Sequence, residues 1–499
     1  MDTTEVKRLV IAGGGTAGWM AAAAFGHQFR GILDITLIES EEIGTVGVGE
    51  STIPPIRGFN KLLGIDEQQF MRMTEATFKL GISFEGWRDG TDRYIHSFGR
   101  NGQPTWLCEF HHFWLRGLDI GIQSELGDYC LELKAAERNK FSNRPPLEMS
   151  YAYHLDASVY AKYLRKFSEA LGVRRIEGKI VEVKQHPESG FVQSLRLNSG
   201  VEVPGDFFID CTGFRGLLIE QALKTGYEEW SHWLICDSAV ALQTESTGAP
   251  VPYTRAIAHE CGWRWRIPLQ HRVGNGLVYC SRYMTDEDAK AKIVRDVEGK
   301  PITEPRVIKF RPGVRRKIWN KNVSALGLAS GFLEPLESTS IHLIMTGITR
   351  LMHVFPFNGI NEMFVDQYNE DVRNEVEQVR DFIILHYHAT QRDDTPFWRE
   401  CRTMDVPHTL KRRIEMFKQS AHAWQGEDEV FRVASWTQVM LGQGITPKHY
   451  HHYAKGMKDD DLRRLLNGMR ASIARTVDSL PSHEEFIAQY CNARTAANA

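Results

Sequence analysis

The sequence predicts an α/β fold built around a parallel β-sheet. An apolar strand at residues 9–12 runs through a glycine-rich turn into an alanine-rich helix, and a second strand follows at residues 33–40. Two further strands, at residues 207–209 and just before Gly327, each lead into a glycine-bearing turn. Strand, helix and strand in this order are typical of the βαβ units that form parallel sheets.

The first turn has the glycine spacing of a dinucleotide-binding loop. In GGGTAG, Gly13 allows the tight turn, Gly15 lets the backbone approach a pyrophosphate, and Gly18 lets the helix pack on the strand. The helix N-terminus offers free N–H groups to the anion. Glu39, 21 residues after Gly18, ends the second strand where a carboxylate can accept from ribose hydroxyls. The candidate cofactor-binding residues here are Gly13, Gly15, Thr16, Ala17, Gly18 and Glu39.

Two later turns favour FAD as the dinucleotide. The strand at 207–209 runs through Asp210 into a turn that contains Gly213, and Gly327 follows the next strand. Together with the first turn, this arrangement resembles the FAD-dependent monooxygenase superfamily, in which one interleaved Rossmann-type fold wraps the dinucleotide and a substrate β-sheet is inserted. The sequence contains no second complete GxGxxG unit for a tightly bound NAD(P)H. Reducing equivalents are therefore expected to arrive on the flavin.

The chain changes character at about residue 361. Residues 361–391 show the 3.6-residue periodicity of a helix through Phe364, Tyr368, Val372, Val376 and Val379, and residues 460–480 form another helical stretch. We therefore expect an FAD-binding and interleaved substrate module at 1–360 and a helical cap at 361–499, packed as one compact unit. Family resemblance implies that this cap completes the substrate chamber.

Composition excludes several classes of partner. The 499 residues carry a formal charge of −3, so no net electrostatic attraction draws the chain to nucleic acid or to an anionic membrane. The sequence contains no apolar run of about 18 residues, the length that a membrane span requires. Its eight cysteines are scattered, which favours free thiols in a cytoplasmic protein. Histidine clusters at 111–112, 386–388 and 449–452 lack the spacing of a metal site.

Residues 262–268, GWRWRIP, place two tryptophans one residue apart. In an extended strand, Trp263 and Trp265 share one face, and Arg264 and Arg266 share the other. From the local pattern alone, this is a half-buried strand with an aromatic core face.

Several stretches together resemble the flavin-dependent tryptophan halogenase family. They are residues 13–19, 46–52, 74–81, 262–268, 333–339 and 394–398. The resemblance adds Gly49 to the cofactor-binding residues. It implies that reduced FAD, O₂ and chloride or bromide generate hypohalous acid, with FADH₂ supplied by a separate NAD(P)H-dependent flavin reductase. Trp263, Trp265, Ile267 and Pro268 would then form a barrier between the flavin and the substrate, blocking direct oxygen transfer.

The resemblance assigns catalysis to Lys79, which directs hypohalous acid to the substrate, and to Glu337. From spacing alone, Glu75 and Lys79 form an i,i+4 pair of the kind found on exposed helix faces. Glu337 is the carboxylate that precedes Ser338 and is implied to stabilise charge on the ring; Glu334 lies three residues earlier.

Further family positions concern the halide and the substrate. Thr339 and Ser340 match the halide-binding amides, although many relatives carry glycine in place of Ser340; a positive φ there would cost serine about 1 kcal/mol. Ser338 is expected to offer its carbonyl to a substrate N–H. His96 and Phe98 match the residues that sandwich an indole ring, with a strand that buries one aromatic residue as the alternative.

The substrate and two rival functions remain open at this stage. The Tyr-Tyr-Glu trio that holds free tryptophan in the family has no identifiable counterpart in residues 435–454. This favours indole or an indole-containing aromatic over free tryptophan, because a site built for a zwitterion needs matching polar groups. The alternatives are an FAD-dependent hydroxylase and a non-catalytic flavin-binding protein. Either a monomer or a homodimer is compatible with the sequence.

Overall fold

The computed structural model describes residues 5–43 and 49–493. The chain divides into two compact units, each assembled from three segments. Unit 1 comprises residues 1–74, 155–232 and 309–377, and unit 2 comprises residues 75–154, 233–308 and 378–499. A separate cap that begins near residue 361 stays a prediction.

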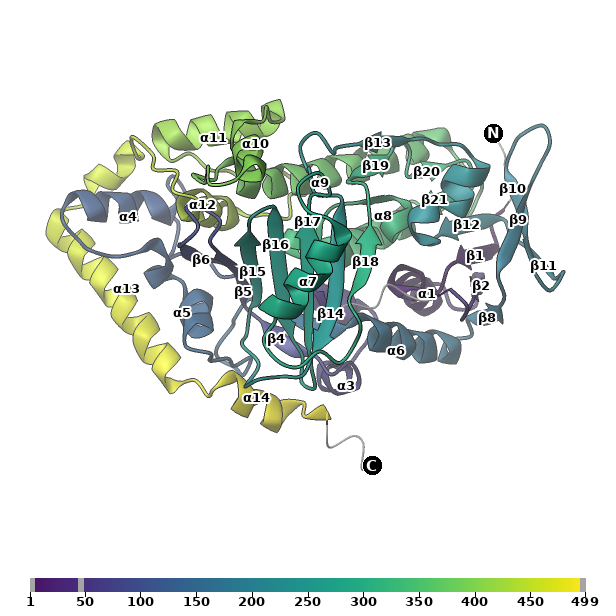
Figure 1. The fold of residues 1–499 in the computed structure, drawn as a ribbon, viewed down its shortest axis with the longest axis horizontal. Coiled ribbons are helices and arrows are strands. Elements are labelled where there is room, and N and C mark those ends of the chain that lie inside the picture. The colour runs from purple at the N-terminus through teal and green to yellow at the C-terminus, as the bar shows by residue number, and fades with distance from the viewer. Residues whose placement is uncertain (1–4, 44–48, 494–499) are drawn as a thin grey trace. The chain divides into compact units, whose positions relative to one another are not determined.

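Unit 1 is built on a six-stranded sheet (Figure 1). In spatial order its strands are β20 (Trp319–Asn320), β21 (Val323–Ala325), β12 (Phe207–Asp210), β1 (Arg8–Ala12), β2 (Asp34–Glu39) and β8 (Arg174–Glu177). All neighbours are parallel except β20 and β21. The strands predicted at the N-terminus, at 207–209 and before Gly327 are thus confirmed.

Both faces of the central strand β1 are covered. Leu9 to Ala12 are buried, and Val10 joins a cluster with Leu195 and Val203 of the small sheet formed by β9 (Ile180–Gln185), β10 (Val192–Leu197) and β11 (Glu202–Pro204). Helix α1 (Thr16–Gln28) packs on β1, β2, α6 (Ala157–Ala170) and α8 (Ser340–His353). A strand buried on both faces needs the continuous apolar run seen in the sequence.

The carboxyl ends of the parallel strands gather the polar elements of unit 1. The glycine turn follows β1, Glu39 ends β2, and Asp210 ends β12. The buried Asp210 carboxylate accepts hydrogen bonds from the amides of Leu218 and Ile219, both at 2.8 Å, so it holds the next turn in place. Ligands in open α/β sheets bind at this edge.

Unit 2 contains a seven-stranded sheet. In spatial order its strands are β18 (Arg306–Lys309), β14 (Ser238–Thr244), β17 (Val273–Tyr279), β16 (Gly262–Pro268), β15 (Thr254–His259), β5 (Gly81–Glu85) and β6 (Arg93–Ser97). The pairs from β14 to β6 are antiparallel except β15 with β5. Helix α7 (Asp286–Asp296) packs on β14 and β17 (Figure 1), and α12 (Val433–Gly442) packs on the edge strand β6.

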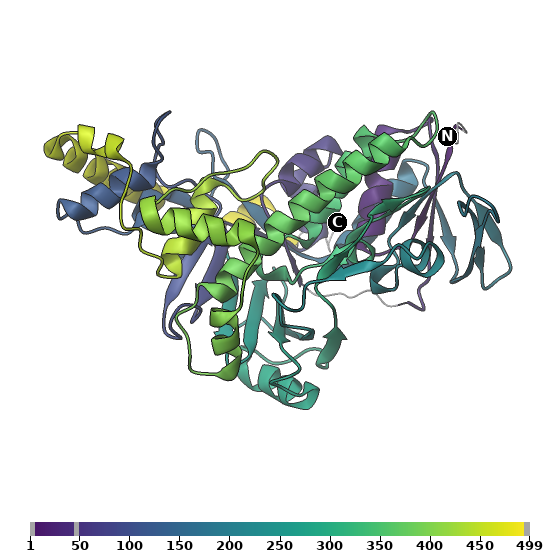
Figure 2. The same ribbon diagram turned by 90° about the horizontal axis from the view of Figure 1, so that it is seen from above.

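The predicted helices of the C-terminal part are confirmed. They are α9 (Glu362–His388), one continuous helix in Figure 2, and α13 (Asp459–Ser479), which packs on α4 (Phe110–Asp119) and α5 (Leu131–Glu137). Tyr368, Val372, Val376 and Val379 are buried, but Phe364 is 53% exposed. Val365, which is 1% exposed, takes the place of Phe364 at the start of the buried apolar face of α9. In the described residues no helix is long and apolar enough to span a bilayer.

Candidate functional site

The glycine turn after β1 has no room for side chains on its inner side. Gly13 has φ +110°, and a Cβ there would lie 2.3 Å from the carbonyl oxygen of Cys211. A Cβ at Gly18 would lie 1.9 Å from the carbonyl oxygen of Gly13. The first and third glycines are therefore required by the fold itself.

The second glycine of the turn faces open space. No atom lies within 4 Å of a Cβ built on Gly15, which is the N-cap of α1 and has an ordinary φ of −76°. The first turn of α1, which opens with Thr16 and Ala17, contains no acidic residue. An open approach to the N-terminus of a 13-residue helix fits the pyrophosphate of a dinucleotide.

Glu39 lies against this turn. A Cβ at Gly14 would lie 1.7 Å from Glu39 Oε2, which accepts a 3.1 Å hydrogen bond from the indole N–H of Trp19. Arg175 and Arg165 form ion pairs with the other carboxylate oxygen. These partners fix the carboxylate while leaving it lone pairs for a ribose hydroxyl.

The remaining predicted cofactor-binding residues are Gly213, Gly327 and Gly49, and they differ in backbone conformation and burial. Gly213 and Gly327 have φ values of +69° and +62°, and a Cβ at Gly327 would lie 2.9 Å from that of Ala17. Gly49 is buried in β3 (Gly49–Ser51). Residues 46–48 of the same motif lie outside the described residues. Burial, with the charge of Asp156, raises the pKa of Glu50 to about 7.

Lys79 lies on a buried strand and not on a helix face. It ends β4 (Thr77–Lys79), which pairs with residues 152–154, and it is 0% exposed. The helical Glu75–Lys79 pair is therefore wrong. Glu75 has φ +52°, and its carboxylate lies 2.6 Å from the ring of His271. The Lys79 ammonium lies 5.0 Å from the ring centre of Phe98, within cation–π range.

A buried histidine stands on the strand beside Lys79. His154 contacts the hydroxyls of Thr77 at 3.1 Å through Nδ1 and of Thr254 at 2.9 Å through Nε2. The Thr77 hydroxyl donates its one hydrogen to the carbonyl of Pro268 at 2.7 Å, so it accepts from the Nδ1–H of His154. Burial, with the charges of Lys79 and His483, holds the pKa of His154 well below its ordinary value. His154 is therefore neutral beside the lysine.

His96 lies on β6, the edge strand of the seven-stranded sheet, and Phe98 follows directly after this strand. His96 is buried, and its ring packs edge-on against Phe382, 5.5 Å between centres. The amide of Ser97 donates a 2.9 Å hydrogen bond to Gln438 Oε1, and Gln438 Nε2 lies 3.4 Å from the carbonyl oxygen of Ser97. One glutamine side chain of α12 thus satisfies the outward backbone groups between His96 and Phe98.

The strand 262–268 buries both tryptophans. Trp263 and Trp265 are 1% and 6% exposed, with ring centres 6.0 Å apart. A Cβ at Gly276, the β17 residue paired with Trp265, would lie 1.8 Å from the indole. The glycine therefore makes room for the ring. Ile267 and Pro268 complete the buried end of the strand.

Glu337 ends a short 3₁₀ turn (Pro335–Glu337) before α8, and Glu337 and Glu334 are both buried. The positive φ of this segment, +60°, belongs to Ser338 and not to Ser340. Ser340 is the first residue of α8 and Thr339 its N-cap, with no acidic residue in the first turn. Serine at 340 is therefore unstrained, and the helix N-terminus presents free amides to an anion.

Two of the three histidine clusters contribute to the aromatic interior, whereas His449, His451 and His452 are exposed. His111 and His112 have ring centres 4.2 Å apart, and His386 stacks on Phe84 at 4.5 Å. Among residues 5–43 and 49–493, no group of three histidine, cysteine or acidic residues is placed to hold a metal ion.

Sequence reasoning missed two residues of this region, His154 and Gln438. His154 lies in a strand whose partner, β4, has a helical sequence pattern, so the pairing could not be foreseen. Gln438 lies inside residues 435–454, but a glutamine carries no local signal for a contact with a strand 341 residues away.

Comparisons with known proteins agree with this architecture. The family model for tryptophan halogenase matches residues 8–459. The solved structure of Xcc4156, a flavin-dependent halogenase from Xanthomonas campestris, is 53% identical with a TM-score of 0.97, covering 98% of this chain and 99% of that one. BrvH, a flavin-dependent halogenase from Brevundimonas sp. BAL3, is 45% identical with a TM-score of 0.93, covering 97% and 99%.

A curated relative extends the likeness. Tryptophan 6-halogenase SttH from Streptomyces toxytricini is 36% identical, covering 98% of this chain and 99% of its own length. The α/β fold, the use of FAD with halide, and a halogenase in preference to a hydroxylase are thereby confirmed. The chain belongs to the tryptophan halogenase family, whose enzymes are flavin-dependent halogenases that use reduced FAD.

Proposed function

We propose that this flavin-dependent halogenase acts on an electron-rich aromatic ring, with Lys79 as the catalytic residue and indole or an indole-containing compound as the acceptor. The observation that carries the proposal is the position of Lys79. A fully buried ammonium lies over the ring of Phe98, at the end of a strand that tertiary pairing holds. A lysine is not kept at such a position for solubility, because burying its charge is costly.

The chemistry divides between the cofactor and the chain. Reduced FAD, held by the glycine turn and Glu39, supplies with O₂ the oxidising power that converts halide into hypohalous acid. The Lys79 ammonium donates a hydrogen bond to the oxygen of hypohalous acid. As the ring carbon takes the halogen, the oxygen–halogen bond breaks and the lysine proton completes a water molecule. The ring then loses its own proton, which restores the proton that Lys79 donated, so that arene and HOX give aryl halide and water.

Neutral His154 suits this role for Lys79. A charged imidazole on the neighbouring strand would repel the ammonium and favour loss of its proton, leaving less of the charged donor. The hydrogen-bonded chain from Pro268 through Thr77 to His154 fixes the tautomer of the imidazole, while burial and the charges of Lys79 and His483 keep it neutral by lowering its pKa.

Glu337 is assigned the stabilisation of positive charge on the ring. A buried carboxylate is the group that an arenium-like transition state needs. The halide is assigned to the amides of Thr339 and Ser340, at the N-terminus of a 14-residue helix without acidic residues in its first turn. The carbonyl of Ser338 is assigned to a substrate N–H.

The acceptor is assigned to the aromatic residues His96 and Phe98. SttH is described as a tryptophan 6-halogenase, which supports an indole ring as the reacting group. Residues 435–454 contribute the buried helix α12 and Gln438, with no recognisable Tyr-Tyr-Glu trio for an amino-acid backbone. This supports indole or a larger indole-containing compound over free tryptophan.

The tryptophan pair supports halogenation against hydroxylation. Trp263 and Trp265, with Ile267 and Pro268, form a buried apolar surface that we assign as the barrier to direct oxygen transfer. Flavin-dependent halogenases generally receive FADH₂ from a separate flavin reductase, and we propose an NAD(P)H-dependent reductase for this chain.

Mass spectrometry on purified protein with FAD, a flavin reductase, NADH and air tests the proposal. Indole, tryptophan and a phenol are offered with chloride and then with bromide. We expect a halogen isotope doublet on indole that Lys79→Ala abolishes, at least about 1,000-fold or ~4 kcal/mol, while FAD binding is retained. A halide-independent gain of one oxygen, or full activity in Lys79→Ala, would overturn it.

A further inference from the structure

A pocket of about 580 Å³ lies in unit 2, outside the residues assigned to halogenation. It is open to one side and is lined by residues of β15, β16, β17 and α7, with Glu260, Arg392 and Asp394. Its charged lining residues are Arg264, Lys292, Arg392, Glu260, Asp296 and Asp394.

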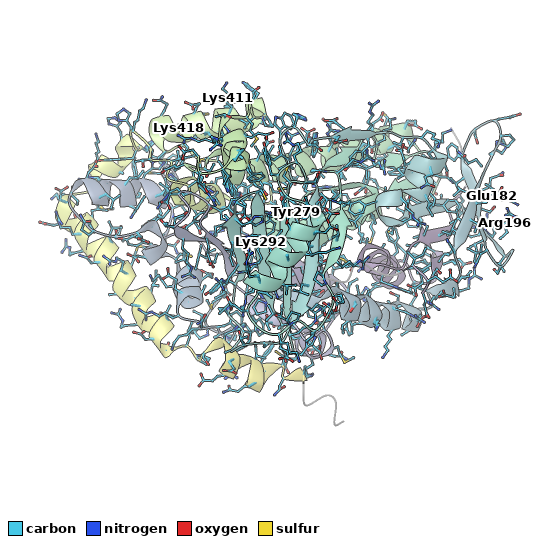
Figure 3. The ribbon with its side chains drawn as sticks, viewed as in Figure 1. Glu182, Arg196, Tyr279, Lys292, Lys411 and Lys418 are labelled. Atoms are coloured by element: carbon cyan, nitrogen blue, oxygen red, sulfur yellow. The ribbon has the colours of Figure 1, made fainter. Side chains whose placement is uncertain are left out.

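The pocket occupies the face of β16 opposite the tryptophans. Side chains alternate along a strand, so Arg264 points away from the side that carries Trp263 and Trp265. Lys292, labelled in Figure 3, projects from α7 and lines the same pocket as Arg264. A ligand in this pocket would therefore contact β16, the strand of the proposed barrier, on the face opposite Trp263 and Trp265.

Each acidic residue of the pocket forms an ion pair with a lysine or an arginine. Lys292 forms ion pairs with Glu260 at 3.1 Å and with Asp296 at 2.9 Å. The Arg392 guanidinium donates two hydrogen bonds to the Asp394 carboxylate, from Nε to Oδ1 at 2.9 Å and from Nη2 to Oδ2 at 2.7 Å. These two cations and three carboxylates carry a net charge of −1, and each carboxylate already has a cationic partner.

Arg264 is the exception. Its Nη1 is buried without a hydrogen-bond partner, and within the described ranges 5–43 and 49–493 it forms no ion pair. Burial and the nearby Arg255 lower the pKa of Arg264, whereas the charges of Glu298, Asp296 and Glu85 oppose this.

The acidic residues near Arg264 but outside the pocket also form ion pairs with other arginines. Arg255 binds Glu85 at 2.7 and 2.8 Å and Glu298 at 2.7 Å, and Arg266 lies 3.3 Å from Glu298. Arg264 as a whole is only partly buried, but its Nη1 is buried without a carboxylate partner, so the desolvation cost of this atom is not offset. The cost is removed if an anion occupies the pocket.

We propose that this pocket binds a small oxyanion, either a carboxylate or a phosphate group, through the guanidinium of Arg264. The planar fork of arginine matches both groups with two parallel hydrogen bonds. The other five charged residues of the lining carry a net charge of −1, so Arg264 makes the lining neutral and the site is limited to a small anionic group that binds Arg264 directly. The site is independent of the halogenation proposal, since it shares no side chain with it.

Calorimetric titration of the FAD-loaded enzyme tests the site. Sodium phosphate is used in one arm and sodium acetate in the other, both against a chloride buffer of equal ionic strength. We expect saturable binding in at least one arm, and the arm that binds identifies the source of the oxyanion. Arg264→Gln should weaken binding at least about tenfold, ~1.4 kcal/mol, with Arg264→Lys intermediate.

A matched control is Arg196→Gln. Arg196 lies on β10 in unit 1 and pairs at 2.6 Å with Glu182; both are labelled in Figure 3. This variant should bind the anion as the unmodified protein does. If Arg264→Gln does not fold, Arg264→Lys decides the question, since it keeps the charge and loses the fork. No saturable binding in either arm, or equal affinity in the folded Arg264 variants, would overturn the proposal.

Discussion

Unit 1 and unit 2 contribute to the enzyme through different parts of the polypeptide. The candidate residues of unit 1 act mainly through backbone, as glycines that exclude side chains and as the amides that open α1 and α8. Those of unit 2 act through buried side chains, with Lys79 and His154 both 0% exposed. Adding side-chain atoms at the glycines should therefore disrupt unit 1. Unit 2 should instead be disrupted when buried polar atoms are removed or when its buried histidines become charged.

The largest effect is expected from a methyl group in the glycine turn. Gly18→Ala puts a Cβ 1.9 Å from the backbone oxygen of Gly13, which cannot move without displacing α1. We expect a loss of about 3 kcal/mol or more in the free energy of unfolding, measured by urea denaturation.

Gly15→Ala is the matched comparison, because its Cβ meets no atom within 4 Å. The cofactor-free protein should keep its stability within about 0.5 kcal/mol, while FAD affinity falls about tenfold or more, since the methyl group enters the space assigned to the pyrophosphate. Equal losses of stability in Gly15→Ala and Gly18→Ala would show that the turn does not separate folding from binding.

Mild acid should affect the two units in opposite directions. In unit 2, burial lowers the pKa of His111 to about 4, of His112 to about 3, and of His259 and His483 to about 4. Unfolded histidines bind protons below about pH 6.5. The unfolded state thus takes up more protons, and the stability of unit 2 falls as the pH drops from about 6.5 to 4.

In unit 1 the sign is reversed for Glu50, whose raised pKa of about 7 favours the protonated carboxyl in the folded state. Its contribution to stability grows as the pH falls from 7 toward about 4.5. Hydrogen exchange read by mass spectrometry at pH 7 and pH 5, corrected for intrinsic rates, resolves the two units. Faster exchange at pH 5 is expected around the histidines of unit 2 but not around Glu50. The same change in exchange rate around Glu50 and around the histidines of unit 2 would contradict this prediction.

A smaller effect is expected from one hydroxyl group beside Lys79. Thr77→Val keeps the shape of the side chain but leaves the Pro268 carbonyl and the Nδ1–H of His154 without their partner. An unsatisfied buried polar group costs about 1–3 kcal/mol, which urea denaturation would detect. Thr77→Ser retains the hydroxyl and should lose less. If Val and Ser cost the same, the hydrogen-bonded chain contributes nothing to stability.

The same contrast explains what the sequence could predict. The glycine turn, β1, α1 and Glu39 follow from local rules, because the spacing and the chain geometry lie within about thirty residues. Lys79 does not, since Glu75–Lys79 has a helical pattern and only pairing with residues 152–154 makes it a strand. Non-local pairing overrides local propensity, so the family resemblance was needed to single out this lysine.

Three other structural features also depend on contacts between segments that are distant in the sequence. The exposure of Phe364 depends on where α9 meets its neighbours, and the positive φ falls on Ser338 because α8 begins at Ser340. The bond from Gln438 to Ser97 joins segments 341 residues apart. None of these positions carries a local sequence signal, and each required the three-dimensional arrangement of the chain.

The smallest expected effect concerns Gln438, a positioning residue. Its side chain supplies β6 with the hydrogen bonds that a further strand would give, at the residue between His96 and Phe98. Gln438→Ala frees that edge, and a small displacement of the two aromatic residues should raise KM for indole and lower kcat/KM about tenfold, with kcat changed less than about twofold. Steady-state kinetics across indole concentrations measures the split.

Gln489→Ala is the control for this variant, because the Gln489 side chain accepts an exposed 3.3 Å hydrogen bond from Arg144, close to the surface of the protein. It should leave both constants unchanged. A fall in kcat with KM unchanged would place the effect of Gln438 on the chemical step at Lys79 and away from substrate binding. Unchanged kinetics would mean that β6 holds His96 and Phe98 in place through its pairing with β5 alone, and that the edge needs no partner.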